Sequence, residues 1–600
     1  MHESKYDRLI LGGHMKIWAL IKPYLVVFLA SLLVVSAIIL NMVPLFGVDG
    51  YFHYNRIYEA AMQIKHQNFS FLNLYSFQEA GRIVSQVYSP LFGYVPGALL
   101  LLTGSWFKFQ VLNLLIVMTI AGTTMYIAAK RLDFSERMSL ALGVIYLTVN
   151  AISTYILTVG WKAIGLAFLP LLFISMVDMV EQRWNIKSAI ALGIFVAIQA
   201  QGHPLNAVFV LPALIPFFVY GFFKATYKLE TIKYLAVAIL VALLLSLNAI
   251  LPYLELSENT VIPPVKIDVT SGIFYPFNLF GGGASVSDNV LSIFALFGIT
   301  SLILYWKKLR FISKSLMIIG LTYFVLGSNL TPWPTIQDQL PMVKAYLQFT
   351  FRFTMVGEAF VLVGTASIIK DIAFNKATTE MVTTFLAVVS VISLATSVSG
   401  QVINNRNPAT TLASGTHTNP VNLILHKNPA TGKPVNSMND LLPDWYGRDL
   451  SQLIRVADRD TPDYVPVTKV LNDFSYYEAY KKNVVAANSK FTKKVLPHGI
   501  LQVTWHQKEN GLQKVPVFAY HHTKLLFNGQ KLNIDTLKRD SSGVIKVSGK
   551  SGVNKLSLSY RTTPMFKTGI IASYWVWIIT VIYSFLLWMM HLKNRLTKSY

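Results

Sequence analysis

The first long apolar segment is followed by three side chains whose chemical types and spacing suit chemistry on a phosphorylated substrate. Asp49, His53 and Arg56 are separated by four and three positions, which in a helix places them on one face. A carboxylate can accept a proton, an imidazole can relay one, and a guanidinium binds phosphate oxygens. Asp49 could instead cap the next helix, and Arg56 could reach lipid head groups. Together, the three residues favour a site that handles a phosphorylated lipid.

A second candidate group lies where a later apolar run begins. Arg352 starts this run, and Gln348 stands four residues before it, which predicts that both share a helical face. An arginine at the edge of an apolar segment needs an anionic partner, and a lipid phosphate or pyrophosphate would serve. The alternative is an internal pair between Arg352 and Glu358 that only fixes helix packing.

Several isolated residues complete the candidates. His203 lies in a His-Pro turn that could line a cavity or form an ordinary turn, and Lys162 could add to a phosphate site or reach the membrane surface. Glu59 and Glu79 could each supply a second acid. No ligand spacing indicates a metal and the chain has no cysteine, so no metal ligand is assigned. Outer carboxylates leave room for a divalent cation as cofactor.

The composition predicts that these residues are held by transmembrane helices. Of 600 residues, 53% are hydrophobic and 14% are charged, with a mean hydropathy of +0.47, far too apolar for a soluble globular protein. The formal net charge of +23 reflects basic clusters between apolar runs rather than a nucleic-acid partner. The first apolar run, 17–46, is too long for a signal-peptide core and is interpreted as a retained helix.

Twelve apolar segments are predicted to span the membrane, with both termini in the cytoplasm. The segments are 17–46, 109–129, 138–158, 163–181, 186–202, 206–223, 232–253, 289–306, 314–328, 353–369, 380–398 and 568–591. In this topology every inner loop is basic, as the positive-inside rule requires. The apolar stretch 90–104 contains two prolines and is interpreted as a re-entrant or surface-lying helix on the outer side.

The domain organisation follows from the same pattern. Residues 1–398 form a transmembrane module with large outer loops at 47–108, 254–288 and 329–352. Residues 399–567 are polar, and their second half alternates as short strands do, which predicts an extracytoplasmic, mainly β domain. Residues 568–600 form the last helix and a basic cytoplasmic tail. The loop 275–289, with three consecutive glycines, could cover a cavity or serve as a linker.

In the order of its motifs, the chain resembles the GT-C superfamily of membrane glycosyltransferases, and in particular its bacterial YfhO-type branch. The resemblance extends over nearly the whole chain, although each motif is short. The motifs are Asp49-x-x-x-His53-x-x-Arg56, YSPLFGYVPGALLLLTG (88–104), AFLPLLF (167–173), GHPLN (202–206), QFTFRF (348–353), PDYVP (462–466) and the alternating segments of 515–560.

The resemblance implies a polytopic enzyme of a bacterial plasma membrane that transfers a sugar from a polyprenyl-phosphate donor. The acceptor would be a cell-envelope polymer or lipid, such as a teichoic or lipoteichoic acid, on the outer face, and transfer would invert the anomeric centre. Asp49 matches the family's base, and Arg352 would bind the donor phosphate. The family often has a carboxylate beside the helix that corresponds to WKAIGLAFLP (161–170), and this chain has none there.

Two other function classes fit parts of the pattern. A flippase for a lipid-linked sugar would also need cationic residues near a lipid cavity, but the ionisable residues gather at the outer edge and no inverted repeat is found. A non-catalytic scaffold for envelope assembly would use the β domain to bind a partner.

Overall fold

The computed structural model describes residues 5–45, 47, 49–156, 159–273, 286–406, 423–429, 431–459, 461–472 and 474–597. These residues form a helical bundle followed by β-sheets and a last long helix, so the predicted fold class is confirmed. The helices are α1 (Lys5–Asn41), α2 (Gly50–Lys65), α3 (Val84–Val87), α4 (Pro90–Thr103), α5 (Trp106–Arg131), α6 (Glu136–Tyr146), α7 (Asn150–Ser153), α8 (Ile164–Phe168), α9 (Leu171–Val180), α10 (Ile186–Gly202), α11 (Pro204–Lys224), α12 (Lys228–Leu256), α13 (Val286–Leu304), α14 (Phe311–Leu326), α15 (Trp333–Gln339), α16 (Met342–Tyr346), α17 (Phe351–Ile372), α18 (Lys376–Arg406), α19 (Met438–Tyr446), α20 (Ser451–Arg455), α21 (Tyr476–Tyr480) and α22 (Pro564–Thr597).

In the described part of the chain, eight helical segments are long and apolar enough to cross a membrane. They are Trp18–Asn41, Trp106–Arg131, Gly160–Val180, Pro204–Lys224, Lys228–Leu256, Phe351–Ile372, Lys376–Arg406 and Pro564–Met590. Three further predicted spans coincide with the shorter apolar helices α10, α13 and α14. The predicted span 138–158 is divided between α6 and α7. The count of twelve spans therefore stays a prediction.

The polar stretch before α22 contains three antiparallel sheets. Strands β1 (Leu423–Leu425) and β2 (Ala457–Arg459) form a small ladder. The larger sheets have the orders β3-β4-β10-β6-β7 and β5-β9-β8. Their strands are β3 (Thr492–Leu496), β4 (Ile500–Gln507), β5 (Gly511–Val515), β6 (Thr523–Phe527), β7 (Gln530–Leu532), β8 (Lys538–Arg539), β9 (Ile545–Gly549) and β10 (Gly552–Tyr560).

The alternating segments 499–507, 524–532, 543–549 and 554–561 coincide with β4, with β6 and β7, with β9 and with β10, whereas β1, β2, β3, β5 and β8 were not predicted. A fifth alternating segment, 515–522, was also predicted as a strand. Asn528 and Gly529 have positive φ angles of 48° and 85°, as a tight hairpin turn between β6 and β7 requires. The predicted strand 515–522 is different, because β5 ends at Val515. Its residues Val517–Tyr520 are buried, and the Phe518 N–H donates to the Ala80 carbonyl at 2.9 Å. The apolar alternation here reflects burial against the first outer loop rather than pairing within a sheet.

The packing divides the polar stretch between two cores. Trp445, Leu453 and Ala457 belong to the main core, which they share with the helical bundle. The larger sheets form a second core, to which Leu72 and Ile83 of the first outer loop also contribute. Helix α18 ends at Arg406 and α22 begins at Pro564, a few residues from the predicted boundaries at 399 and 567. The three-part domain organisation stays a prediction.

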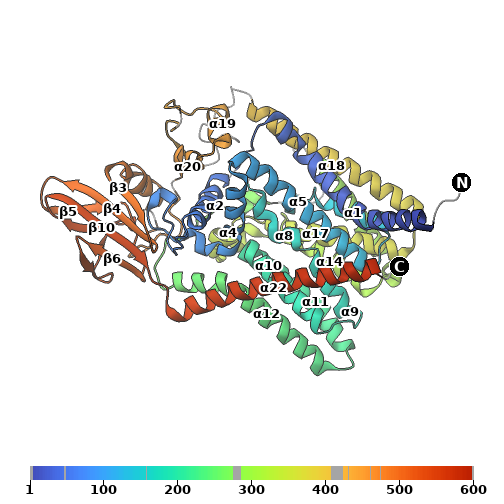
Figure 1. The fold of residues 1–600 in the computed structure, drawn as a ribbon. Coiled ribbons are helices and arrows are strands. Elements are labelled where there is room, and N and C mark those ends of the chain that lie inside the picture. The colour runs from blue at the N-terminus through green and yellow to red at the C-terminus, as the bar shows by residue number, and fades with distance from the viewer. Residues whose placement is uncertain are drawn as a thin grey trace.

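The sheets lie at one end of the bundle, and the beginning of α1 and the end of α22 lie at the other (Figure 1). The Asp49 region follows α1 and therefore lies at the end of the bundle that carries the sheets.

Candidate functional site

Asp49 lies between two cationic side chains that come from distant parts of the chain. Its Oδ1 accepts a hydrogen bond from Arg459 Nη2 at 3.0 Å, and its Oδ2 lies 3.4 Å from Lys162 Nζ. Asp49 directly precedes α2 with a left-handed φ of 63°, but its side chain does not cap that helix. The capping interpretation therefore does not describe the side chain, which faces the two cations instead.

Side-chain hydrogen bonds fix the segment that precedes Asp49. The amide of Gln110 in α5 accepts from the Leu45 N–H at 2.9 Å and donates to the Leu45 carbonyl at 2.6 Å. The Tyr54 hydroxyl oxygen in α2 also accepts from Gln110 Nε2, at 3.0 Å. The hydroxyl of Tyr51 donates to the carbonyls of Ile454 and Ala457. These bonds hold the start of α2 against both α5 and the segment that carries Arg459.

The cations keep Asp49 ionised. Burial alone would raise the pKa of this carboxyl, but Lys162 and Arg459 outweigh burial and hold the pKa well below its usual value. A carboxylate with such a low pKa is a weak base at neutral pH. Asp49 can act as a strong base only after the two cations have moved or been neutralised.

His53 and Arg56 lie on the same face of α2, as their spacing predicts, and they contact each other. Arg56 Nη1 lies 3.1 Å from His53 Nδ1. Since a guanidinium can only donate, Nδ1 must accept, and the ring proton belongs on Nε2. Burial, Lys162 and Arg56 hold the pKa of His53 well below its usual value, so the imidazole is neutral near pH 7.

Arg56 is also held by the loop that follows α3. Its Nη2 donates to the Tyr88 carbonyl at 2.7 Å, and its guanidinium lies 4.7 Å from the centre of the Tyr88 ring. Burial lowers the pKa of Arg56 to about 10, so it stays a cation at neutral pH. Its Nε is buried and has no hydrogen-bond partner among the described residues. Arg56 therefore keeps one N–H for a ligand.

Arg352 lies in the first turn of α17, and its side chain contacts the turn that precedes the helix. Its Nη1 donates to the carbonyls of Tyr346 and Leu347 at 3.2 and 2.7 Å, and its Nη2 donates to Gln348 Oε1 at 3.1 Å. Gln348 has a φ of 62° and lies outside the helix. The prediction that the two residues share a helical face is therefore wrong, because the chain turns between them, although the side chains do meet.

The alternative partner of Arg352, Glu358, has hydrogen bonds to another helix. Glu358 is buried and accepts hydrogen bonds from the Asn150 side chain at 2.8 Å and the Ala151 N–H at 3.2 Å. Glu358 thus joins α17 to α7, and Arg352 stays near the end of the bundle that carries the sheets.

His203 interacts electrostatically with the same cations. It separates α10 from α11, and its Nδ1 accepts from the Leu205 N–H at 3.3 Å. Burial, Arg352, Lys162 and Arg56 hold the pKa of His203 well below its usual value. Its ring also makes an edge contact with Tyr88, with centroids 6.2 Å apart. His203 thus caps the beginning of α11 and interacts electrostatically with these cations, while its place in a cavity stays a prediction.

All seven predicted site residues thus belong to one neighbourhood at the sheet end of the bundle. We call Lys162, Arg352, Arg56 and Arg459 the cationic cluster. Arg459 was not predicted, because nothing in its local sequence distinguishes it from a surface arginine. It ends β2, its side chain is only 16% exposed, and its guanidinium lies 5.8 Å from the Phe52 ring centre.

A second carboxyl, Asp463, was also missed. It is buried, and its Oδ1 has no hydrogen-bond partner among the described residues. Burial raises the pKa of Asp463 to about 6, against the lowering effect of Arg82 and Arg459, and the charge of Asp49 contributes to the rise. It lies in the motif PDYVP, so the sequence indicated the segment without indicating the residue.

The other two acids of the first outer loop have structural surroundings. Glu59 accepts hydrogen bonds from Gln63, Ser76 and the N–H groups of Leu74 and Tyr75, all between 2.8 and 3.0 Å. These bonds pin the loop to α2. Glu79 interacts electrostatically with Lys493 and Arg455 rather than with Asp49. Both carboxylate oxygens of Asp49 face cationic nitrogens, and a divalent cation as cofactor stays a prediction.

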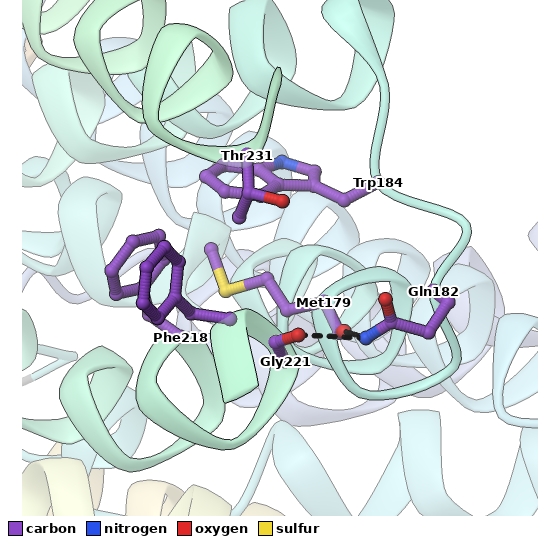
Figure 2. A pocket seen from close by; sticks show the side chains of 7 residues that line it. Met179, Gln182, Trp184, Phe218, Gly221 and Thr231 are labelled. Atoms are coloured by element: carbon purple, nitrogen blue, oxygen red, sulfur yellow. Dashed lines mark hydrogen bonds between the residues drawn. The ribbon is translucent and has the colours of Figure 1, made fainter. Parts of the chain in front are cut away.

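A small pocket elsewhere in the bundle has no part in this site. It is lined by Met179, Gln182, Trp184, Phe218, Gly221, Phe222 and Thr231 (Figure 2). Gln182 Nε2 donates to the carbonyls of Gly221 and Met179 at 2.9 and 3.2 Å. The pocket lies beside the beginning of α10, whereas His203 follows the end of that helix, roughly 25 Å away.

Comparison with protein-family models and with curated proteins gives no match. Solved structures with a related arrangement include the arabinofuranosyltransferase AftD from Mycobacteria, with 13% identity over 64% of this chain and 27% of that chain, and a TM-score of 0.42. The oligosaccharyltransferase of Archaeoglobus fulgidus has 12% identity over 64% and 56% of the two chains, with a TM-score of 0.38. The arabinosyltransferase EmbB of Mycobacterium smegmatis has 9% identity over 89% and 63%, with a TM-score of 0.36.

This chain spans between 27% and 63% of the length of those three proteins. All three are sugar-transferring enzymes by name. At these identities and TM-scores, the similarity does not establish a shared activity or a family, and the YfhO-type branch remains a resemblance of sequence motifs.

Proposed function

We propose that the chain is a membrane glycosyltransferase that moves a sugar from a polyprenyl-phosphate donor to a cell-envelope acceptor. The observation that carries the proposal is the carboxylate of Asp49 held between Lys162 and Arg459, with Arg352 and Arg56 in the same neighbourhood. One acid among four cations is the arrangement needed to hold an anionic leaving group beside a proton acceptor.

The cationic cluster is suited to the donor phosphate. Each of its members comes from a different element at the sheet end of the bundle: the turn before α8, α17, α2 and β2. Arginine binds phosphate through paired N–H groups, while lysine acts as a point charge. The lipid tail of the donor would lie between helices, and its phosphate would meet the cluster at the edge of the membrane.

Binding of the phosphate would also activate Asp49. In the absence of donor, Lys162 and Arg459 depress the pKa of the carboxyl. A phosphate that draws these cations away, or neutralises their charge, raises that pKa and makes the carboxylate a better base. Asp49 would therefore become a stronger base only when the donor is in place.

The reaction then balances as a displacement. Asp49 takes the proton of an acceptor hydroxyl while that oxygen attacks the anomeric carbon, and the bond from this carbon to the phosphate oxygen breaks. The leaving phosphate stays bound to Arg352 and its neighbours. Attack from the face opposite the phosphate inverts the anomeric centre. His53, neutral and hydrogen-bonded to Arg56, would orient that arginine.

The proposed setting is a bacterial plasma membrane with both termini in the cytoplasm. The basic inner loops and the placement of the sheets opposite the described ends of α1 and α22 (Figure 1) support this orientation. The acceptor would then be an envelope polymer or lipid on the outer face, such as a lipoteichoic acid.

The test is transfer by purified protein in lipid nanodiscs from a labelled polyprenyl-phosphate sugar to extracted envelope polymer. Asp49→Asn should reduce transfer by at least about a hundredfold, because the proton acceptor is lost. Arg352→Lys should weaken donor use, since paired N–H contacts are lost. Asp338→Asn is the matched control, because that carboxylate lies in another outer loop and is 75% exposed.

Equal transfer by wild type and Asp49→Asn, at equal folded amounts, would remove the proposed mechanism. Movement of labelled donor across liposomes without any modified acceptor would favour a flippase instead. Binding of envelope polymer without transfer would favour the scaffold.

A further inference from the structure

Away from Asp49, four side chains with metal-ligating groups meet where the helical bundle joins the sheets. His521 and His522 form the turn before β6, Glu258 follows the end of α12, and Glu255 belongs to the last turn of α12. Ligand atoms of Glu258, His521 and His522 lie within 4.8 Å of one another. His522 Nε2 is 2.7 Å from Glu258 Oε2 and 3.8 Å from Glu255 Oε1.

The geometry points to a transition-metal site of the zinc class, formed by His521, His522 and Glu258. Two imidazoles and a carboxylate are the donor set that Zn²⁺ and its neighbours prefer, whereas Ca²⁺ and Mg²⁺ favour oxygen ligands. Three protein ligands leave the fourth position of a tetrahedral zinc for water. No residue of this group belongs to the cationic cluster or contributes to the proposed glycosyl transfer.

Glu255 adds a buried carboxyl beside this group. Its side chain is fully buried. Its Oε1 lies 3.8 Å from His522 Nε2 and accepts from the Thr563 N–H at 3.0 Å, next to the start of α22. A cation bound to His522 would therefore lie close to a buried acid, which favours the cation without ligating it.

The surrounding backbone holds the two histidines in place before any metal arrives. The His521 N–H donates to Asn259 Oδ1 at 2.8 Å, which ties the turn to the end of α12. The His522 carbonyl accepts from the Arg561 N–H at 3.1 Å, and the His522 ring makes an edge contact with Tyr560, with centroids 6.1 Å apart. Ligands with such fixed orientations lose little freedom when they bind a metal.

The consequence of occupancy would be structural. The metal would join α12 of the bundle to the turn before β6, so it would fasten the sheets to the bundle. A metal that binds the folded chain and not the unfolded chain stabilises it by mass action.

The test uses the full-length protein in detergent, stripped with a chelator, titrated with Zn²⁺ and freed of loose metal by gel filtration. Wild type should retain about one zinc per chain by elemental analysis, as a single site requires, and should unfold at a higher temperature with zinc than without. The double variant His521→Gln and His522→Gln should lose at least about tenfold in zinc affinity. His506→Gln, at an exposed histidine of β4, should behave as wild type.

Wild-type protein that retains no zinc, or a double variant that retains as much as wild type, overturns the proposal. Substitution with Co²⁺ gives a second readout on the unmutated chain. Visible absorption bands of four-coordinate cobalt with histidine ligands support the site, and their absence contradicts it even if the double variant fails to fold.

Discussion

At the scale of single residues, two opposing effects set the pKa values of the carboxyls in the site: burial raises them, and nearby cations lower them. Asp49 has two cationic partners and a depressed pKa, whereas Asp463 is buried with one oxygen unpartnered among the described residues and a raised pKa. Two carboxyls of one neighbourhood with pKa values shifted in opposite directions are typical of functional sites.

The first prediction concerns the pH dependence of transfer by Arg459→Gln. Removing this cation takes away one of the interactions that lower the pKa of Asp49, so that pKa should rise. The base then becomes protonated at a higher pH, and the acidic limb of the pH profile of kcat/KM should move upward by about one unit. Arg448→Gln, at an exposed arginine nearby, should leave the profile in place. An unshifted acidic limb in Arg459→Gln would contradict the assignment of Asp49 as base.

The second prediction concerns stability and Asp463. Because folding raises the pKa of this acid to about 6, its protonated form is favoured in the folded chain. Its contribution to stability is fully present below about pH 4, the usual pKa of an aspartic acid, and is lost as the pH rises through 6.

Asp463→Asn should therefore raise the free energy of unfolding at pH 8 by roughly 1–3 kcal/mol and leave it nearly unchanged at pH 4. Denaturant unfolding at the two pH values measures the difference. Asp535→Asn, at an exposed acid between β7 and β8, serves as the control. A variant that is less stable than wild type at pH 8 would show that the carboxylate is held by a partner.

At the scale of elements, close helix crossings fix where the site residues lie. Gly202 ends α10 one residue before His203, and a Cβ added there would lie 2.7 Å from the Cα and N of Gly165 in α8. Gly165 in turn stands three residues after Lys162. The distance between Lys162 and His203 thus depends on a backbone contact that only glycine permits.

The third prediction follows from that crossing. Gly202→Ala should lower the free energy of unfolding by about 1–3 kcal/mol, because the added methyl group forces α8 and α10 apart, and transfer should fall because Lys162 moves. Gly400→Ala is the matched control, since a Cβ at Gly400 in α18 meets nothing within 4 Å. There the change should be stabilising by about 0.5–1 kcal/mol. Thermal unfolding in detergent compares the two variants, and equal effects would contradict the packing argument.

The periodicity of the sequence predicted the helices and strands better than it predicted which of their residues contact one another. The apolar runs and alternating strands follow from local patterns that hydropathy and turn residues encode. The contact of Arg459 with Asp49, 410 positions away, has no local signal, and the turn at Gln348 breaks an expected helical face. The sequence did indicate Lys162, Arg352 and His203, because an ionisable side chain at the end of an apolar segment costs free energy.

At the scale of the whole molecule, the polar stretch before α22 contributes to two separate hydrophobic cores. Its first part, including Trp445 and Ile454, is buried with the helical bundle, and its second part is buried with the first outer loop. Removal of residues 399–567 would therefore expose the main core and remove Arg459, so loss of activity in that deletion would not by itself distinguish an enzyme from a scaffold.

The last prediction tests the membrane topology on which the orientation of the site depends. Because the chain contains no cysteine, a single introduced cysteine reports its own side of the membrane without background. Glu509→Cys lies in an exposed turn between β4 and β5, and Lys187→Cys lies at the exposed beginning of α10. If the termini are cytoplasmic and the sheets outside, a membrane-impermeant maleimide should label Glu509→Cys in intact cells and Lys187→Cys only after lysis. Labelling of Lys187→Cys in intact cells would invert the orientation and place the Asp49 site on the cytoplasmic face, where the proposed donor and acceptor would have to be sought instead.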